Sequence, residues 1–452
     1  MRFSTSFECC LPSLRLATSA NRSLATDQSY RTDPSSTDRQ VANLNIKIYR
    51  RLDRFLGVPL CALLSLIDRF RRRSAFTASP QRILVILLSE TGSLVLASPM
   101  LAQLTRRYPN ASLYLLVSAR SRGVLDVLKV VPDKNILTLN DSSLRAFAAD
   151  MWRVLRVLRR STIDIAIDCE LFARISSVFS YLSDAQLRVG FHRHTQEGLY
   201  RGSFINRPVL YNPYRHMSEQ FLTMVDAIDS RSVPLVKKTS FSEFTIKPAA
   251  LPKEDIGVVV AKLHTDFPAI EHKHLVLFYP GGGVLPIRAW PLGYYCQLCS
   301  GLLADGYAVG IIGLEGDKTL GSLITAFCKN RCCIDLTGYT NSLQDLLALY
   351  HRAALIVAND GGPAQLAALT STPALVLFGP ETPTLYKPLG VNVHCLYRPL
   401  PCSPCLTAYN HRNSPCDGDN QCLKQITPDQ ALAKARDILG LRRVAPEVVK
   451  AD

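Results

Sequence analysis

The chain has 452 residues, of which 47% are hydrophobic and 20% charged, and it carries a formal net charge of +15 at pH 7. This composition is typical of a globular protein with two to three domains, and it excludes a chain that is disordered throughout. The positive charge is concentrated near the N-terminus, where residues 1–79 contain 13 Lys and Arg against 6 Asp and Glu. Such a segment can bind nucleic acid or an anionic membrane surface.

The first 79 residues divide into two parts of different composition. Residues 1–45 are rich in Ser, Thr, Arg and Gln without sustained periodicity, which predicts a disordered leader rather than a signal peptide. Residues 46–79 contain the uncharged run 55–67 between two groups of arginines. A helix needs roughly 20 residues to span a bilayer, so we expect this shorter run to lie in the membrane interface with its arginines at the headgroups. The alternative is a helix packed on the protein's own core.

From residue 80 onward, apolar runs of strand length alternate with segments of helical spacing. The first half predicts strands at 83–88, 112–117, 136–139, 163–168 and 188–190, with helices at 95–108 and 144–159. A polar stretch at 233–252 predicts a linker, and a helix follows at 253–266. The second half predicts strands at 275–279, 308–313, 334–336, 355–358 and 374–378, with helices between them.

This alternation predicts an α/β protein with two doubly wound, Rossmann-like domains that face a cleft. We expect the N-terminal domain at residues 80–250, the C-terminal domain at residues 251–440 and a tail at residues 441–452. Ligands of such sheets bind at the carboxyl ends of the strands, where each loop meets a helix.

The loop after the predicted strand 355–358 carries the most informative residues. Here Asn359-Asp360-Gly361-Gly362 separates the strand from an Ala-rich helical segment. Glycines at such a turn let a ligand approach the backbone, and the N–H groups at the helix start favour a pyrophosphate. Asp-Gly-Gly is also ordinary turn chemistry. Other strand ends carry similar loops, namely Ser89-Glu90-Thr91-Gly92-Ser93, Asp168 with Glu170, Pro280-Gly281-Gly282-Gly283 leading to Arg288, and Gly313-Leu314-Glu315-Gly316.

Fourteen cysteines are scattered along the chain, which argues against a disulfide scaffold. One group stands out, with His411 inside it: Cys402, Cys405, Cys416 and Cys422. A Cys-x-x-Cys followed by two more cysteines can hold zinc, although the wider spacing of the second pair weakens the match. Reduced thiols that stabilise a loop, or a disulfide, are the alternatives.

Together these loops resemble those of the bacterial lipopolysaccharide heptosyltransferases, the ADP-heptose glycosyltransferases of family 9. The resemblance covers residues 82–439, and it implies the GT-B fold of two Rossmann domains. It also implies an inverting transfer of a sugar from a nucleotide diphosphate to an acceptor hydroxyl, with ADP-heptose as co-substrate and no metal or other cofactor. The residues that carry it are Asn359-Asp360-Gly361-Gly362-Pro363, Phe378-Gly379-Pro380-Glu381-Thr382-Pro383, Arg288-Ala289-Trp290-Pro291, Gly313 with Glu315, Gly92-Ser93, Arg188-Val189-Gly190-Phe191, Arg215-His216 and Cys402-Ser403-Pro404-Cys405.

The resemblance implies a donor site in the C-terminal domain. Arg288 stands where the family has a phosphate-binding lysine, and its guanidinium can bind phosphate oxygens in a bidentate way. Glu315 is expected near the adenosine ribose, and Gln365 stands where the family often has histidine. The alternatives are structural: a solvated Arg288, a turn carboxylate at Glu315 and a helix cap at Asp360. The expected donor-binding residues are Gly281, Gly282, Glu315, Asn341, Asp360, Gly361, Gly362 and Gln365.

The acceptor side departs from the family in the first loop. Heptosyltransferases typically have an aspartate base directly after the glycine, where this chain has Ser93, and an unassisted hydroxyl is a poor base at neutral pH. We predict that Glu90 replaces it, because a carboxylate partly desolvated in a cleft can act as a base. A solvated loop acid or a helix N-terminal charge is the alternative. The candidate catalytic residues are Glu90, Ser93 and Arg288, and the acceptor-side candidates are Gly92 and, as reserve bases, Asp168 and Glu170.

The predicted function is therefore that of a glycosyltransferase in cell-envelope glycan assembly, cytoplasmic and peripheral on the inner membrane. Its expected partners are the nucleotide-sugar donor, a lipid-linked or polysaccharide acceptor and the membrane surface through residues 46–79, with no nucleic acid. Two alternatives remain: a catalytically inactive GT-B scaffold that binds glycan or nucleotide, and a GT-B sugar-nucleotide epimerase.

Overall fold

In the computed structural model the chain divides into a first unit, residues 1–48, and a second unit, residues 49–452. All the described residues belong to the second unit. They are residues 53, 55–71, 79–88, 91–171, 173–192, 200–230, 246, 249, 251–283, 285–408 and 414–440. The predicted leader and tail, most of the predicted linker, Glu90 and His411 lie outside the described residues.

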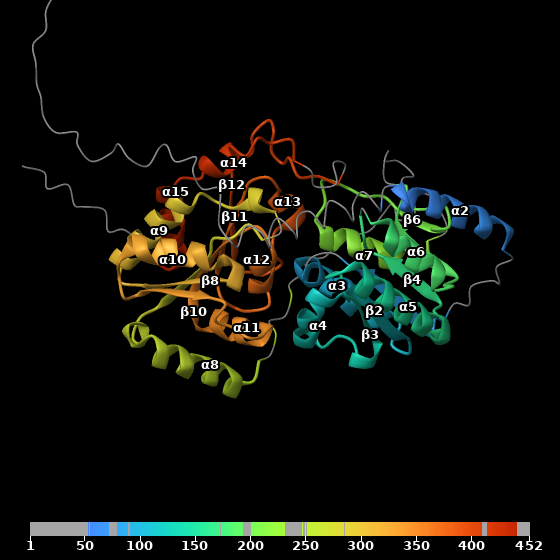
Figure 1. The fold of residues 1–452 in the computed structure, drawn as a ribbon, viewed down its shortest axis with the longest axis horizontal. Helices are drawn as coiled ribbons and strands as arrows, with labels where there is room; N and C mark the ends of the chain where they lie inside the picture. Colours follow the sequence, from blue (N-terminus) through green and yellow to red (C-terminus); the bar gives the residue numbers. More distant parts are fainter. Residues whose placement is uncertain are drawn as a thin grey trace, which may run out of the picture. The chain divides into compact units, whose positions relative to one another are not determined.

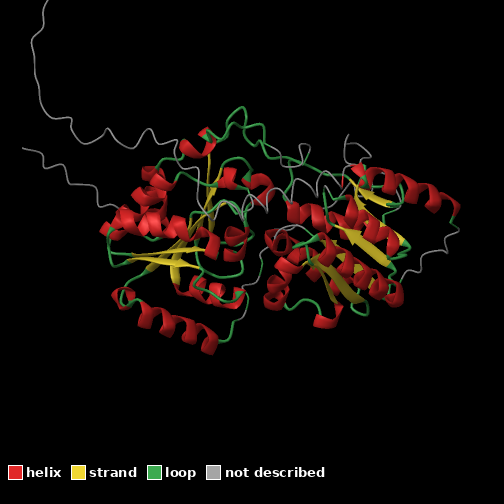
Figure 2. Cartoon of the chain, viewed as in Figure 1, coloured by secondary structure: helices red, strands yellow, loops and turns green. Residues whose placement is uncertain are grey.

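Six parallel strands form the first sheet, in the order β3-β2-β1-β4-β5-β6 (Figure 1 and Figure 2). The strand order reverses between β1 and β4, which is the switch point of a doubly wound sheet. β1 is apolar and buried at nearly every position, as expected for a strand covered on both faces. The bounds are β1 Arg82–Leu87, β2 Ser112–Ser118, β3 Ile136–Leu139, β4 Ile165–Asp168, β5 Leu187–Phe191 and β6 Arg207–Val209.

Helices cover both faces of this sheet. On one face, α3 Thr91–Arg107, α4 Arg122–Leu128 and α7 Met217–Ala227 share a core with β1 residues such as Val85. On the other face, α5 Leu144–Ser161 and α6 Arg174–Leu182 pack on alternate positions such as Leu84. Side chains of a strand point alternately to the two faces, so the uninterrupted apolar run of β1 serves both cores.

A further helix, α2 Gly57–Phe70, packs on α6. Its buried residues are Cys61, Leu64 and Asp68, which are three and four positions apart and therefore share one helical face. Asp68 forms a buried ion pair with Arg188 of β5, with 3.0 Å between Oδ1 and Nη2. On this face, therefore, the run 55–67 is a helix packed on the protein's own core, which was the alternative to a helix in the membrane interface.

The opposite side of α2 is apolar and exposed. Its large hydrophobic side chains, and those of the two residues just before the helix, have exposed fractions between 40% and 80%: Phe55, Leu56, Leu60, Leu63, Leu66, Ile67 and Phe70. No helix in the described part of the chain combines the length and the hydropathy needed to cross a membrane.

The second sheet also has six parallel strands, in the order β12-β11-β10-β7-β8-β9. Read from β9, this order repeats that of the first sheet, and the switch point lies between β7 and β10. The bounds are β7 Leu275–Tyr279, β8 Ala308–Gly313, β9 Cys333–Thr337, β10 Ala353–Asn359, β11 Ala374–Phe378 and β12 Val393–Tyr397.

Helices cover both faces of the second sheet as well (Figure 1). Those that share a core with one face are α8 Lys253–Asp266, α11 Leu343–Arg352 and α12 Gly362–Ala367. Those on the other face are α9 Leu292–Ala304, α10 Lys318–Cys328, α14 Gln421–Lys424 and α15 Pro428–Ile438. The short helix α13 Pro383–Tyr386 follows β11.

The prediction of two doubly wound α/β sheets is confirmed, but two strands escape the sequence pattern. Both are edge strands. β6 has three residues and contains Pro208, and β12 is only partly buried at four of its five positions. These two lack the continuous apolar run that marks a strand buried on both faces, so the pattern does not reveal them.

Candidate active site

Asn359 joins the two loops at the switch point of the second sheet. This last residue of β10 is completely buried. Its Nδ2 donates to the carbonyl oxygens of Pro280 and Gly281 in the loop after β7, both at 3.0 Å. Its Oδ1 accepts from the backbone N–H of Trp290 and from the Tyr295 hydroxyl, both at 3.1 Å. All four hydrogen-bonding positions of the amide are used, which holds the loops after β7 and β10 in one arrangement.

The glycines after β7 make a turn that brings Arg288 into the interior. A Cβ on Gly282 would lie 2.8 Å from the Leu285 carbonyl oxygen, and Gly283 has a φ of +60°. Both positions therefore favour glycine. A short 3₁₀ turn, Pro286–Arg288, follows and ends with Arg288 buried. A buried charge is costly unless it is paired.

Arg288 lies between two buried carboxylates. Its Nη2 donates to Glu381 Oε1 at 3.2 Å, and its Nε lies 3.6 Å from Asp360 Oδ2. The three residues come from the loops after β7, β11 and β10, which are neighbouring parallel strands with their carboxyl ends at one edge. The carboxylates orient the guanidinium before any ligand arrives, and they can also accept hydrogen bonds from hydroxyl groups.

The Asp360-Gly361-Gly362 turn leaves space beside the backbone. A Cβ on Gly361 or Gly362 would meet no atom within 4 Å, so ligand atoms can come close to the first N–H groups of α12. Gln365 lies one turn further along α12, and its Nε2 donates to the Tyr386 carbonyl oxygen at 2.6 Å. Its Oε1 is buried and has no hydrogen-bond partner among the described residues.

Glu315 and Asn341 lie after β8 and β9, on the other side of β7 from Asp360 in the strand order. Glu315 is exposed and pairs with Lys318 at 3.4 Å. An added Cβ on Gly338 would lie 2.1 Å from Glu315 Oε2, so glycine is needed there for this approach. Asn341 is exposed beside the start of α11. The structure thus places these two donor candidates after strands whose carboxyl ends lie at the same sheet edge as Arg288.

The first turn of α3 lies against α12. A Cβ on Gly92 would come within 2.9 Å of Gln365 Cγ, so the absence of a side chain at Gly92 permits this approach. Ser93 follows and is half-buried. Glu90 precedes this turn but lies outside the described residues, so its role as a base stays a prediction. The described part of the first loop is nevertheless adjacent to the helix that carries the donor turn.

The reserve bases Asp168 and Glu170 are tied into the fold of the first sheet. Asp168 is completely buried, forms an ion pair with Arg201 and accepts from two serine hydroxyls of α6. Glu170 Oε1 accepts from the Leu88 N–H at 2.7 Å. That bond joins the loops after β4 and β1, as Asn359 joins the corresponding loops of the second sheet. Both carboxylates have structural partners, which makes them poorly suited to the role of base.

The predicted cysteine group at residues 402–422 is spread over the surface and the core. Cys402 and Cys416 are exposed, Cys405 accepts a hydrogen bond from the Ser414 hydroxyl, and Cys422 is buried. All four are among the described residues, yet no three of their sulfurs lie within 4.8 Å of one another. This geometry gives no support to the alternative of a zinc site at this group.

Two features of the site were not assigned from the sequence. Glu381 belongs to one of the motifs that carry the family resemblance, but no role was predicted for it. The sequence does contain a signal: Glu381 follows β11, which lies beside β10, so it reaches the same sheet edge as Asp360. The bridging role of Asn359 has no signal in the sequence pattern, because its four partners lie 64 to 79 positions away along the chain.

The assembled residues have the chemistry of a nucleotide-sugar site. An oriented guanidinium and the N–H groups of a helix start can hold a diphosphate. The neighbouring carboxylates and the Gln365 amide can bind hydroxyl groups of a sugar.

Comparisons with known proteins agree with this chemistry. The family model described as "Glycosyltransferase family 9 (heptosyltransferase)" matches residues 151–414. Lipopolysaccharide heptosyltransferase 2 of Salmonella typhimurium is 24% identical over 364 residues, which cover 79% of this chain and 98% of that protein.

Solved structures share the fold. The structure of E. coli ADP-heptose lipopolysaccharide heptosyltransferase II has a TM-score of 0.59 at 21% identity, covering 79% of this chain and 98% of that one. E. coli heptosyltransferase WaaC with ADP-2-deoxy-2-fluoro heptose has a TM-score of 0.53 at 16% identity, covering 79% and 99%. The predicted GT-B architecture is therefore confirmed.

Proposed function

Because the chain belongs to glycosyltransferase family 9, whose model matches more than half of its residues, we propose that it transfers heptose from ADP-heptose to a hydroxyl group of a lipopolysaccharide core. Its similarity along 79% of its length to a lipopolysaccharide heptosyltransferase supports this donor and acceptor. The observation that carries the proposal is the buried Arg288 between Asp360 and Glu381, at the carboxyl ends of β7, β10 and β11.

Residues of both domains have a role in the proposed reaction. The acceptor oxygen bonds to the anomeric carbon from the face opposite the diphosphate, and the bond to the departing diphosphate breaks. Arg288 and the N–H groups at Gly362 stabilise the negative charge that develops on the diphosphate. Asp360 and Glu381 orient the guanidinium and accept hydrogen bonds from sugar hydroxyls. Glu90 takes the acceptor proton, and Ser93 orients the acceptor hydroxyl.

The test is a transfer assay with the full chain, ADP-heptose and lipopolysaccharide that lacks its core heptose. We expect Arg288→Met to lower kcat/KM about 10²–10³-fold, the effect of removing one donor that stabilises a developing charge. The matched control is Arg436→Met. This substitution also removes an arginine–carboxylate pair, because Arg436 donates to Asp305 at 2.7 and 2.8 Å, but Arg436 lies on α15 and not among the proposed site residues. Its kcat/KM should stay within about twofold of the native value.

Removing one partner of a buried ion pair destabilises by about 3–5 kcal/mol, so thermal unfolding of each variant must accompany the assay. Arg288→Lys retains the cation, and lysine is the residue that the family has at this position, so this variant should keep more activity than Arg288→Met and lose less stability. Native activity in a folded Arg288→Met chain would contradict the assignment. No transfer by the native chain would favour the scaffold alternative, and release of a free sugar without acceptor would favour the epimerase.

The identity of the nucleotide base in the donor can be tested directly. A ligand at about 100 times its dissociation constant stabilises the folded state by roughly 2.7 kcal/mol. We expect ADP-heptose and ADP to raise the melting temperature more than UDP and GDP sugars at equal concentration. A larger shift with a UDP or GDP sugar would change the proposed donor.

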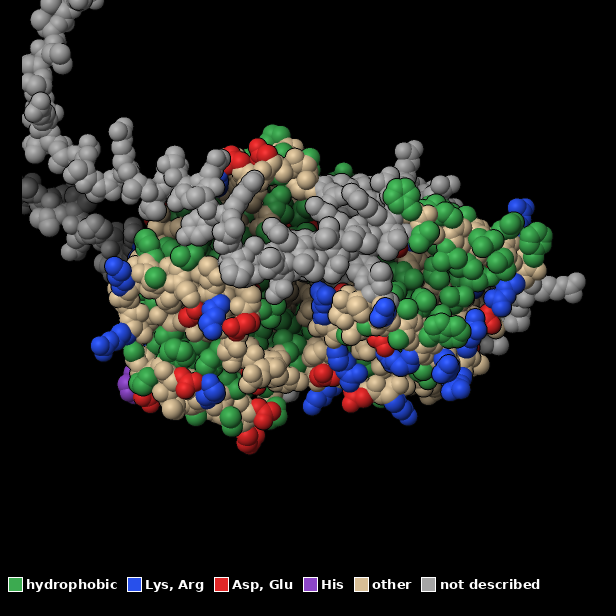
Figure 3. Space-filling model, viewed as in Figure 1, with side chains coloured by type: hydrophobic (Ala, Val, Ile, Leu, Met, Phe, Trp, Pro, Cys, Tyr) green, Lys and Arg blue, Asp and Glu red, His purple; other side chains and the backbone are tan. Residues whose placement is uncertain are grey.

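We also propose that the exposed side of α2 binds an anionic membrane surface, on the cytoplasmic face of the inner membrane. Figure 3 shows hydrophobic side chains gathered over α2, with Lys and Arg side chains at the border of the patch. A contiguous apolar patch bordered by basic residues is typical of an interfacial helix. The buried Asp68–Arg188 pair fixes which side of α2 faces outward.

α5 adds a second basic surface with one aromatic side chain. Arg145, Trp152, Arg156 and Arg159 are exposed and lie at intervals of seven, four and three residues, so they form one stripe along the helix. Trp152 is 67% exposed, and α5 and α2 both pack on α6. Arginines favour anionic headgroups, and tryptophan favours the interface between headgroups and acyl chains.

Vesicle binding can be read from the protein's own fluorescence. The chain has two tryptophans, of which Trp290 is buried and Trp152 exposed, so a blue shift on adding anionic vesicles reports Trp152. We expect Leu63→Asp with Leu66→Asp to abolish sedimentation with these vesicles. The matched control is Val258→Asp, at another exposed apolar position, on α8. Equal binding by the two variants, or no binding by the native chain, would contradict the proposal.

A further inference from the structure

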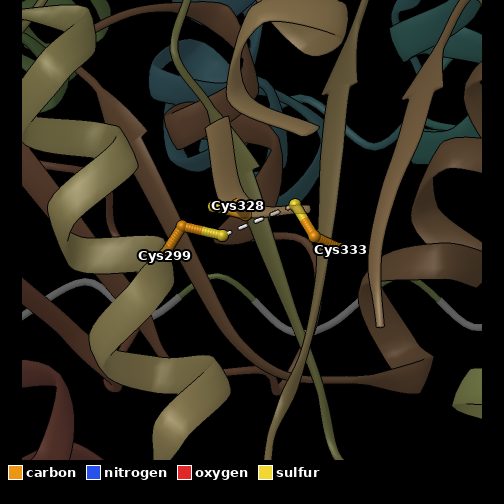
Figure 4. A group of neighbouring side chains, drawn as sticks. All are labelled: Cys299, Cys328 and Cys333. Atoms are coloured by element: carbon orange, nitrogen blue, oxygen red, sulfur yellow. Dashed lines mark hydrogen bonds between the residues drawn. The ribbon is translucent and has the colours of Figure 1, made fainter. Parts of the chain in front are cut away.

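Three cysteines from α9, α10 and β9 come together on one side of the second sheet (Figure 4). Cys299 lies on α9, Cys328 is the last residue of α10, and Cys333 is the first residue of β9. Their sulfurs all lie within 4.8 Å of one another, and those of Cys299 and Cys333 are 3.5 Å apart. Within the described ranges, no other three His, Cys, Asp or Glu side chains place their ligand atoms this close together.

We propose that Cys299, Cys328 and Cys333 form a three-thiolate site for a thiophilic closed-shell metal ion, Zn(II) or Cu(I). Thiolates select these ions over hard cations such as Mg(II), and the group contains no carboxylate or imidazole. Zn–S bonds of about 2.3 Å in a tetrahedral arrangement place the sulfurs about 3.8 Å apart. The 3.5 Å between the Cys299 and Cys333 sulfurs is close to that value, and the Cys328 sulfur lies within 4.8 Å of both, so small side-chain movements are enough to bind an ion.

The chemistry of the group favours a thiophilic cation. A bound ion lets the three thiols ionise, forming three metal–sulfur bonds and releasing their protons to solvent. The C-terminal end of α10, where Cys328 lies, also favours positive charge.

The burial of the three thiols fits a structural site with one open side. Cys299 and Cys333 are buried, and Cys328 is half-buried, which gives an ion a path from solvent. An ion there would tie the edge strand β9 to α9 and α10. This site is separate from the Cys402 group and from Arg288, and its existence does not depend on the proposed transfer reaction.

The test is a competition titration of the full chain, first stripped with a chelator and kept reduced, with Zn(II) or Cu(I) against a chromogenic chelator. A background with Cys402→Ser and Cys405→Ser removes uptake by the other cysteine group. We expect one equivalent to bind in this background. Cys328→Ser should weaken it by more than about 100-fold, because loss of a ligand costs more than loss of outer-shell partners, which costs about 10–100-fold.

The matched control is Cys395→Ser, which removes a half-buried thiol on β12 whose pKa burial raises to about 12. It should leave the metal affinity unchanged. Equal affinity in the Cys328→Ser and Cys395→Ser chains, or no binding of either ion, would overturn the proposal.

A second measurement needs no substitution. In the native chain, Zn(II) should slow alkylation of Cys328 by iodoacetamide, mapped by peptide mass spectrometry, and leave that of Cys395 unchanged. The same rate of Cys328 alkylation with and without both ions would also overturn the proposal. Far-ultraviolet circular dichroism of each variant separates loss of the site from loss of the fold.

Discussion

Asn359→Asp is the substitution that tests the switch-point geometry most directly. It keeps the shape of the side chain but replaces the Nδ2 donor by an oxygen that faces the Pro280 and Gly281 carbonyl oxygens, each now 3.0 Å from Nδ2. A buried acceptor that loses its donor costs about 1–3 kcal/mol. Two such losses amount to about 2–6 kcal/mol, a large part of the 5–15 kcal/mol that typically stabilises a folded protein.

The matched control is Asn392→Asp. Asn392 is exposed, and its Nδ2 also donates to a backbone carbonyl oxygen, that of Ser371, at 3.1 Å. Because water can replace this bond, its loss should cost no more than about 0.5–1.5 kcal/mol. Urea unfolding followed by circular dichroism measures both variants.

The same substitution should lower activity, because Arg288 and Asp360 lie on the two loops that Asn359 joins. A displacement of about 1 Å at a reacting group can cost about 10²-fold in rate. We therefore expect a fall of this order in kcat/KM for the Asn359→Asp chain that remains folded. Equal destabilisation of the two variants, with native kcat/KM in both, would refute the reasoning.

Three further predictions follow from the site and its surroundings. Glu90→Gln should reduce kcat by about 10²–10⁴-fold with the dissociation constant of ADP unchanged; unchanged turnover would remove Glu90 as the base. Gly92→Ala should lower kcat/KM, because the new Cβ would lie 2.9 Å from Gln365 Cγ. The further loss caused by Gln365→Ala should then be smaller in the Gly92→Ala chain than in the native chain, whereas additive effects would argue against this contact. Burial lowers the pKa of His216 and His351, so the unfolded chain takes up protons first as the pH falls below about 6.5, and stability measured by urea unfolding should decrease there. Replacing both histidines by glutamine should reduce this decrease, and greater stability at acidic pH would contradict the assignment.

The sequence predicts those parts of the fold that depend on local pattern. The strand 275–279 and the helix 253–266 have the predicted bounds, because an apolar run or a helical spacing marks each of them within a short window. The face on which α2 is buried is not a local property. It depends on Asp68 finding Arg188, 120 positions away, so the sequence supports both the interfacial and the packed interpretation, and the structure contains a face for each.

The candidate site shows the same division. Glycines and charges at strand ends indicate Arg288 and Asp360, because parallel strands bring their carboxyl ends to one edge. The distances between those charges do not follow from the pattern, and neither does the pairing of Arg288 with Glu381, 93 positions away. Asp168 shows a related limit, since the pattern places a carboxylate at a strand end but does not reveal its buried partner Arg201, 33 positions away.

The ion pairs beneath α2 have a practical consequence for anyone who shortens this chain. Trimming it to begin at the first strand, in order to remove the apolar helix and improve solubility, would also remove Asp53 and Asp68. These carboxylates neutralise Arg174 and Arg188, whose side chains are only 6% and 3% exposed. Both guanidinium groups would lose their carboxylate partners, and the apolar side chains that pack on Cys61 and Leu64, such as Val178 and Tyr181, would become exposed. The trimmed protein would lose stability together with its apolar surface, so substitutions on the outer face of α2 are the better way to obtain a soluble form.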